Sequence, residues 1–181
     1  MALRYIVPIV GASTLGATAS ADVVSFSRTF HNTTSVARTY EYSVSVPLVG
    51  QRGAMVMNGT VTASLIDLNG NGAYMRAVGS TPVYAAMIDE SVVHSMWHPG
   101  WLYAVGGFVS GSADPDRFSR MPITVAGEGI GSMRITLRFE LSPRDMATVG
   151  AMFEVTPIPV PAAWAGLLLL RIPGRRRLDS G

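Results

Sequence analysis

The stretch Thr39-Tyr-Glu-Tyr-Ser-Val-Ser-Val-Pro-Leu48 decides the fold class of this chain of 181 residues. Large apolar side chains stand at every second position from Tyr40 to Leu48, and small or polar residues stand between them. Successive side chains of a β-strand point to opposite faces of the sheet, so this alternation predicts a strand with one buried face.

The same period of two recurs from Met57 to Ile66 and from Arg134 to Leu141. No apolar pattern of helical period runs for the usual length of a helix. Seven to nine short strands, separated by turn residues, are therefore expected between residues 22 and 156, with Gly111 to Arg120 as a polar loop. The prediction is an all-β domain, an antiparallel β-sandwich of Greek-key or jelly-roll type, and the pattern leaves these two topologies open.

Residues 1–21 have the layout of a secretory signal peptide. Arg4 supplies a positive charge, an apolar run extends to Leu15, and Ala19-Ser-Ala21 is a cleavage site of the A-x-A type. We therefore expect export machinery and signal peptidase as partners, and a mature chain that begins at Asp22.

The opposite end, residues 157–181, is organised as three parts. Prolines alternate with other residues from Pro157 to Pro161, which favours an extended segment without a hydrogen-bonded ladder. Nine apolar or small residues follow from Ala162 to Leu170, and basic residues then dominate the end of the chain. Such a segment suits transient contact with a membrane, with the arginines at its anionic cytoplasmic face. These arginines are Arg171, Arg175, Arg176 and Arg177.

The motif Pro159-Val-Pro161, the apolar segment and the cluster Arg175–Arg177 resemble a PEP-CTERM sorting signal. Val160 stands where that family usually has Glu, as in its Val-Pro-x-Pro-Ala variants. The apolar segment is also shorter than the roughly 20 residues of a membrane-spanning helix. The resemblance implies export, transient anchoring in the inner membrane and processing by an exosortase-type transpeptidase. It further implies a final location at the cell surface or in an exopolysaccharide matrix.

Composition limits the function classes. Residues 22–156 contain nine arginines against six aspartates and five glutamates, a net charge of −2. The basic character of the whole chain therefore comes from its two ends, and nucleic acid is not expected as a partner. The chain has no cysteine, so disulfides and thiol catalysis are excluded and one ordinary core must hold the domain together.

One candidate metal site is the turn Asp67-Leu-Asn-Gly-Asn-Gly72, which matches the first half of a calcium-binding loop. Oxygens of Asp67, Asn69 and Asn71 would face a weakly bound Ca²⁺, with Asp89 as a distant carboxylate. However, the twelfth position of the loop is Val78 rather than Glu. A hairpin turn is the favoured interpretation, and no other cofactor is expected.

Two further groups of residues are candidates for ligand binding, and each also has a simpler structural interpretation. His94 and His98 have a spacing that suits a metal only on a helix, and here a Pro-Gly pair follows them. Trp97, Trp101 and Tyr103 are candidates for stacking against sugar rings, although core packing is the default for such residues.

Catalysis has little support in the sequence. No G-x-S-x-G motif occurs, and the acidic pairs Asp89-Glu90 and Asp114/Asp116 have no diagnostic arrangement. We therefore expect a non-enzymatic structural or adhesive protein. A secreted hydrolase of polysaccharide is the alternative, and an aromatic-lined cleft with two convergent carboxylates would favour it.

Overall fold

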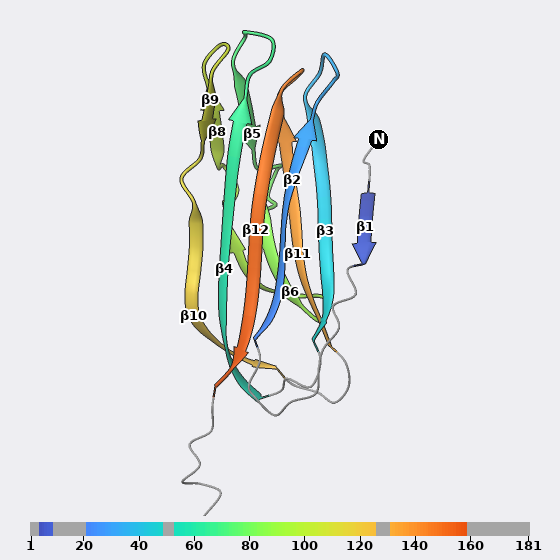
Figure 1. The fold of residues 1–181 in the computed structure, drawn as a ribbon, viewed down its shortest axis with the longest axis vertical. Helices are drawn as coiled ribbons and strands as arrows, with labels where there is room; N and C mark the ends of the chain where they lie inside the picture. The colour runs from blue at the N-terminus through green and yellow to red at the C-terminus, as the bar shows by residue number, and fades with distance from the viewer. Residues whose placement is uncertain (1–3, 9–20, 49–52, 126–130, 159–181) are drawn as a thin grey trace, which may run out of the picture.

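The computed structural model describes residues 4–8, 21–48, 53–125 and 131–158, and every regular element within them is a strand. The predicted all-β class and the antiparallel sandwich are confirmed. Figure 1 shows two layers, with β10, β4, β12 and β2 side by side in front of the second sheet. The strands are β1 (Arg4–Pro8), β2 (Asp22–His31), β3 (Arg38–Leu48), β4 (Gly53–Ile66), β5 (Ala73–Arg76), β6 (Tyr84–Ile88), β7 (Ser91–Met96), β8 (Leu102–Val105), β9 (Ser110–Ser112), β10 (Asp116–Val125), β11 (Gly131–Leu141) and β12 (Met146–Pro157).

The order of the strands identifies the topology. Sheet A runs β1-β3-β11-β5-β8, with β6 and β7 beside β11, and sheet B runs β10-β4-β12-β2, with β9 beside β4. Along the chain, β2, β3, β4 and β5 lie alternately in sheets B and A, as do β10, β11 and β12. This alternation wraps the chain around the core as in a jelly roll, which settles the topology that the sequence left open.

The two strands with the clearest alternation, β3 and β11, are neighbours in sheet A. Their antiparallel register runs from Arg38 opposite Leu141 to Leu48 opposite Gly131, without a bulge. The register places the apolar positions of both strands on one face, which is the buried face. This pair therefore fixes the inner surface of sheet A.

Aromatic and hydrogen-bonding contacts join the two sheets across the core. Phe30 on β2 meets Phe139 on β11 edge to face, with ring centroids 5.0 Å apart. Tyr84 on β6 is fully buried, and its hydroxyl donates to the carbonyl of Met152 on β12 at 3.2 Å. The core between the sheets is thus mainly apolar, and the hydrogen bond of Tyr84 is a polar contact that joins the two sheets across it.

The prediction of a polar loop from Gly111 to Arg120 was wrong, because this segment contains two of the three residues of β9 and the first half of β10. Both strands pair with β4 at the edge of sheet B. Much of an edge strand is in contact with water, so its polar composition does not distinguish it from a loop. The structure accordingly has more strands than the seven to nine expected.

Strand β1 lies within the predicted signal peptide and pairs in parallel with the outer edge of β3. Residues 9–20, which include Ala19, lie outside the described part of the chain. The cleavage site therefore stays a prediction. If cleavage occurs there, the mature domain has β3 as the edge of sheet A.

Candidate functional site

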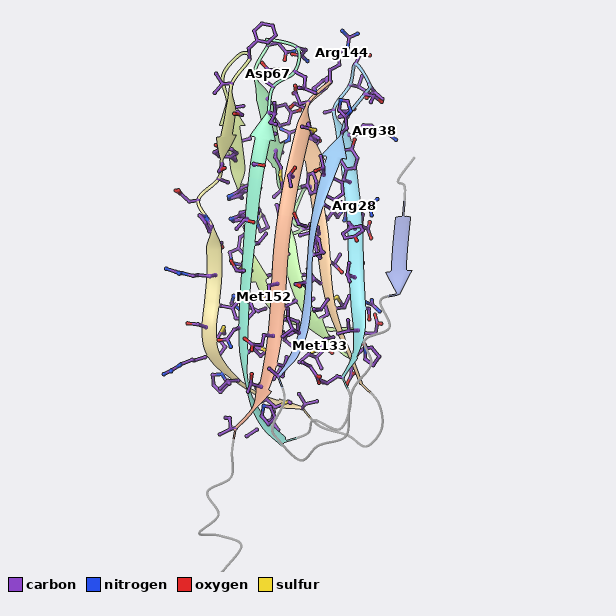
Figure 2. All side chains as sticks on the ribbon, in the orientation of Figure 1. Arg28, Arg38, Asp67, Met133, Arg144 and Met152 are labelled. Carbon is purple, nitrogen blue, oxygen red and sulfur yellow. The ribbon has the colours of Figure 1, made fainter. Side chains whose placement is uncertain are left out.

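The candidate calcium loop is a tightly hydrogen-bonded turn at one end of the sandwich, between β4 and β5 (Figure 2). The carboxylate of Asp67 is nearly inaccessible and accepts four backbone N–H groups. Oδ1 accepts from Asn69 and Gly70, each at 3.1 Å. Oδ2 accepts from Gly72 at 3.1 Å and from Phe108 at 2.7 Å. Burial alone would raise the pKa of Asp67, but these donors outweigh it and lower the pKa below its usual value.

The side chain of Asn69 is also engaged in the loop. Its Oδ1 accepts the N–H of Asn71 at 3.0 Å, and its Nδ2 donates to the carbonyl of Pro143 at 2.8 Å. A cation would have to displace these donors from the oxygens of Asp67 and Asn69. The hairpin interpretation was wrong in one respect, because the turn joins β4 of sheet B to β5 of sheet A, and these two strands do not pair. No cluster of three acidic or histidine side chains suited to a metal occurs within the described residues.

A buried polar network extends from this loop, and no motif in the sequence predicts it. Oδ1 of Asp145 accepts the N–H of Leu68 at 3.3 Å, and Oδ2 accepts the hydroxyl of Ser142. That hydroxyl oxygen in turn accepts the N–H of Tyr74 at 2.8 Å. Burial is the main cause that raises the pKa of Asp145, and the nearby Asp67 raises it further. The two carboxyl groups thus have opposite pKa shifts.

The histidine pair does not form a metal site. The ring of His94 packs against that of Phe118, with centroids 4.2 Å apart, and burial lowers the pKa of His94. The neighbouring carboxylate of Asp116 accepts the backbone N–H of Trp97 at 3.4 Å. His94 therefore lies among packing groups, whereas His98 is exposed, and the described ranges offer no third ligand.

The candidate sugar-stacking residues mostly belong to the core. Trp97 is only 4% exposed, and Trp101 stacks on it with ring centroids 4.3 Å apart and an interplanar angle of 11°. Trp101 and Tyr103 are partly buried against the core cluster. Trp97 thus serves as packing, and Trp101 alone of the three also lines an open groove.

This groove has a volume of about 410 Å³ and lies over the ends of β5, β8 and β11. The register places Glu140 beside Arg76, and Arg76 beside Leu102, in one row across three strands. Nη2 of Arg76 lies 2.6 Å from Oε1 of Glu140, which also accepts the hydroxyl of Tyr74 at 3.1 Å. The groove is lined by Arg76, Ala77, Val78, Gly79, Gly100, Trp101, Leu102 and Glu140.

The outward face of sheet B is the second surface of note. One row across four paired strands consists of Thr29, Thr148, Ser64 and Ser112. The hydroxyl oxygens of Thr29 and Thr148 lie 2.8 Å apart. We call the hydroxyl-bearing part of this surface the hydroxyl face, and it comprises Ser25, Ser27, Thr29, Thr60, Thr62, Ser64, Ser112 and Thr148. The alternation from Met57 to Ile66 predicts that Thr60, Thr62 and Ser64 share one side of β4, but the row across the sheet follows only from the strand pairing.

The acidic pairs named from the sequence do not converge on the groove. Asp89 accepts the N–H of Ser132 at 2.7 Å, and Glu90 forms an ion pair with Arg134. Asp116 is engaged with Trp97, as described above. Within the described residues, Glu140 is the one carboxylate that lines the groove.

The sorting motif lies outside the described residues, which end at Ile158. This applies to Pro159, Val160, Pro161 and Arg175–Arg177, so the sorting signal stays a prediction. Among the described residues, no helix has the length and apolar character needed to cross a membrane.

Comparisons with known proteins give no relative from which a function could be transferred. No protein-family model matches the chain, and no curated protein matches it. Among solved structures, a chain from "Structure of infectious bursal disease virus Gx strain" is 13% identical, with a TM-score of 0.20. The match covers 87% of this chain and 48% of the viral one, so this chain spans about half its length. A likeness at this level supports no conclusion about function, which must rest on the residues described above.

Proposed function

We propose that this protein is an exported, non-catalytic domain of the cell surface or extracellular matrix that associates with exopolysaccharide in a structural or adhesive role. The hydroxyl face of sheet B is the observation that carries the proposal. The outward positions from Ser25 to Thr29 on β2 and from Thr60 to Ser64 on β4 carry hydroxyl side chains and no charge, and the row of Thr60 ends at the exposed Arg117 on the edge strand β10. Hydroxyl groups both donate and accept, and so match the hydroxyl groups of a polysaccharide.

The regular spacing of this face suits a repeating ligand. Neighbouring strands lie about 4.8 Å apart, and residues on one face of a strand repeat about every 6.7 Å. Each hydrogen bond with a sugar replaces one with water and contributes little on its own, about 1 kcal/mol. Many such contacts along one chain add up, so the face favours a long polysaccharide over a short one.

The two ends of the chain supply the delivery route in this proposal. The signal peptide would export the protein, and the PEP-CTERM-like tail would hold it transiently at the inner membrane until an exosortase-type transpeptidase processes it. A hydrolase would instead need two convergent carboxylates in a cleft. Glu140, the carboxylate lining the groove, already has Arg76 and Tyr74 as partners.

Delivery is tested by intact-mass analysis of the protein from envelope and medium fractions of its native host. The proposal expects a species that starts at Asp22 and ends near Pro157–Pro161. A chain from the same fractions that retains residues 1–21 or Arg175–Arg177 contradicts the processing route.

Matrix association is tested by co-sedimentation with the exopolysaccharide of the host. Replacing both Thr62 and Thr148 by Glu places two charges on the hydroxyl face and should reduce binding at least about tenfold. Thr124→Glu is the control, since Thr124 is exposed on the edge strand β10 opposite Ala54, beyond the rows that contain Thr60, Thr62 and Ser64. Equal binding by the double variant and the control would refute a role for the hydroxyl face.

A further inference from the structure

The Arg76–Glu140 groove has the composition of a binding site for an uncharged polyhydroxy ligand. It combines one guanidinium, one carboxylate, the exposed side chain of Leu102 and the backbone of two glycines. The side chain of Glu140 is 21% exposed and that of Arg76 is 53% exposed, so both remain accessible from the groove. The hydrogen bond from Tyr74 and the shortest ion-pair contact of Arg76 both use Oε1 of Glu140.

The polar groups of the groove are held in place before any ligand arrives. The hydroxyl of Tyr74 donates to Glu140, and the guanidinium of Arg76 lies 5.3 Å from the centre of the Tyr74 ring. Arg76 is thus held between the ring of Tyr74 and the carboxylate of Glu140. Because its side chain is already ordered, it loses little conformational entropy when a ligand binds. Such preorganisation reduces the entropic cost of binding a ligand.

We infer that this groove binds a neutral hexopyranose segment of a polysaccharide, with Arg76 and Glu140 engaging a pair of adjacent sugar hydroxyls. Arg76 donates to one hydroxyl oxygen, and Oε2 of Glu140 accepts the proton of the next. The ligand class rests on the proposed association with exopolysaccharide, whereas the site itself rests on the groove.

Charge selects a neutral sugar over a uronic acid. The charges of Arg76 and Glu140 cancel, and the six other lining residues are uncharged. An acidic sugar would place its carboxylate near Glu140 and compete with it for Arg76. A neutral sugar leaves the ion pair intact and adds hydrogen bonds to both partners.

The remaining lining residues suit the flat side of a sugar ring. Leu102 is 59% exposed in the same row as Arg76, and offers an apolar surface to the C–H groups of the ring. No atom lies within 4 Å of where a Cβ would stand on Gly79 or Gly100, so a ligand can approach both backbones closely.

The test uses the full-length ¹⁵N-labelled chain, titrated with cellohexaose, laminarihexaose and maltohexaose as neutral probes and with hexagalacturonate as the acidic probe. At least one neutral hexasaccharide should shift the amide signals of Ala77–Gly79 and Gly100–Leu102 more strongly than the acidic probe does. Arg76→Gln and Glu140→Gln should each weaken this binding at least about fivefold. Gln at position 140 can still accept from Tyr74, so the fold is retained.

Arg134→Gln is the matched control, because Arg134 forms an ion pair with Glu90 on the same sheet but does not line the groove. It should bind as the unaltered protein does. The inference is overturned if no neutral probe shifts these signals, if hexagalacturonate binds more tightly, or if all three variants behave alike. Normal co-sedimentation of Glu140→Gln with host exopolysaccharide, without any groove shifts in the unaltered protein, would refute the groove and retain the proposed function. Groove binding by the unaltered protein without co-sedimentation would retain the groove as a sugar site and refute the proposed function.

Discussion

Oδ2 of Asp67 accepts the backbone N–H of Phe108 at 2.7 Å, and so ties the loop after β4 to the loop before β9. The residues are 41 positions apart in the chain. Phe108 has a φ of +56°, which is unfavourable for a residue with a side chain. The contact with Asp67 is therefore one of the interactions that hold this strained loop in place.

We predict that Asp67→Asn lowers the thermal midpoint by at least about 5 °C, because buried N–H donors lose a charged acceptor and meet an NH₂ group. The effect depends on pH. The lowered pKa of Asp67 contributes stability above its ordinary value of 3.8, and this contribution is lost as the pH falls through the folded-state pKa. The difference between the variant and the unaltered protein should thus be larger at pH 7 than at pH 3 in thermal melts. An equal difference at both values would contradict the prediction.

Asp145→Asn should not destabilise the protein at pH 7 as Asp67→Asn does, although Asp145 is also buried and lies beside Asp67. The raised pKa of Asp145 means that its ionised form is disfavoured in the fold. That cost appears as the pH rises from 3.8 through the raised pKa and persists at pH 7. A neutral Asn can donate to Asp67, so we expect unchanged or higher stability at pH 7 in urea titrations. A loss as large as that of Asp67→Asn would show that both carboxylates are needed in ionised form.

The hydrogen bond between Tyr84 and Met152 gives a prediction on how the sheets are joined. Tyr84→Phe removes the donor to a buried carbonyl and keeps the ring, so it should cost about 1 kcal/mol of unfolding free energy. Burial raises the pKa of Tyr84, so its hydroxyl should stay protonated in alkaline solution until the protein unfolds. Urea denaturation and ultraviolet titration of tyrosinate measure these two effects. Tyrosinate formation by all six tyrosines below the unfolding pH would be inconsistent with this burial.

Gly59 on β4 lies against the ring of Phe118 on β10, and a Cβ at Gly59 would stand 2.3 Å from the ring carbon Cε1. Phe118 is only 8% exposed and cannot move away freely. Gly59→Ala should therefore destabilise the domain by about 1–3 kcal/mol through overpacking. In a double-mutant cycle, Phe118→Leu should recover part of this loss, because the smaller side chain leaves room for the methyl group. Strict additivity of the two changes would place the strain elsewhere.

The sequence predicted the parts of the fold that depend on local pattern. The alternation in β3 and β11 is long and regular, and it located both strands correctly. The prediction from local pattern was wrong from Gly111 to Arg120, because edge strands and loops have similar polar compositions. The turn motif from Asp67 to Gly72 fits both a calcium loop and a hairpin, and the N–H of Phe108, which completes the ring of donors, comes from a distant segment.

The Arg76–Glu140 groove could not be predicted from the sequence, because it too depends on contacts between distant segments of the chain. Its two charged residues are cross-strand neighbours through the register of β5 and β11. Only two residue pairs define that contact, and no periodicity in either strand fixes it. Core packing was the default interpretation of Trp97, Trp101 and Tyr103, with sugar stacking as a candidate role, and Trp97 is buried in agreement with that default.

Asp22 connects the fold to the predicted cleavage after Ala21. Its Oδ2 is buried without a hydrogen-bond partner among the described residues, and burial raises its pKa. The ionised carboxylate is therefore disfavoured in the full-length fold, and stability falls as the pH rises from 3.8 through the raised pKa. In a chain that begins at Asp22, the new α-ammonium group, with a pKa of about 7.7, stands on the same residue and favours the ionised form.

We predict that Asp22→Asn stabilises the full-length chain at pH 6 by a few tenths of a kcal/mol, since the group is partly solvated. The same substitution should give no gain in a chain that starts at residue 22, because the ammonium group already compensates the carboxylate. Unfolding free energies from urea titrations of the four proteins at pH 4 and pH 6 test this. At pH 4 the two full-length proteins should differ less than at pH 6, since the carboxyl is then largely protonated. A gain of the same size in both chain lengths would mean that the new N-terminus does not compensate Asp22, and that cleavage leaves this buried charge as costly as before.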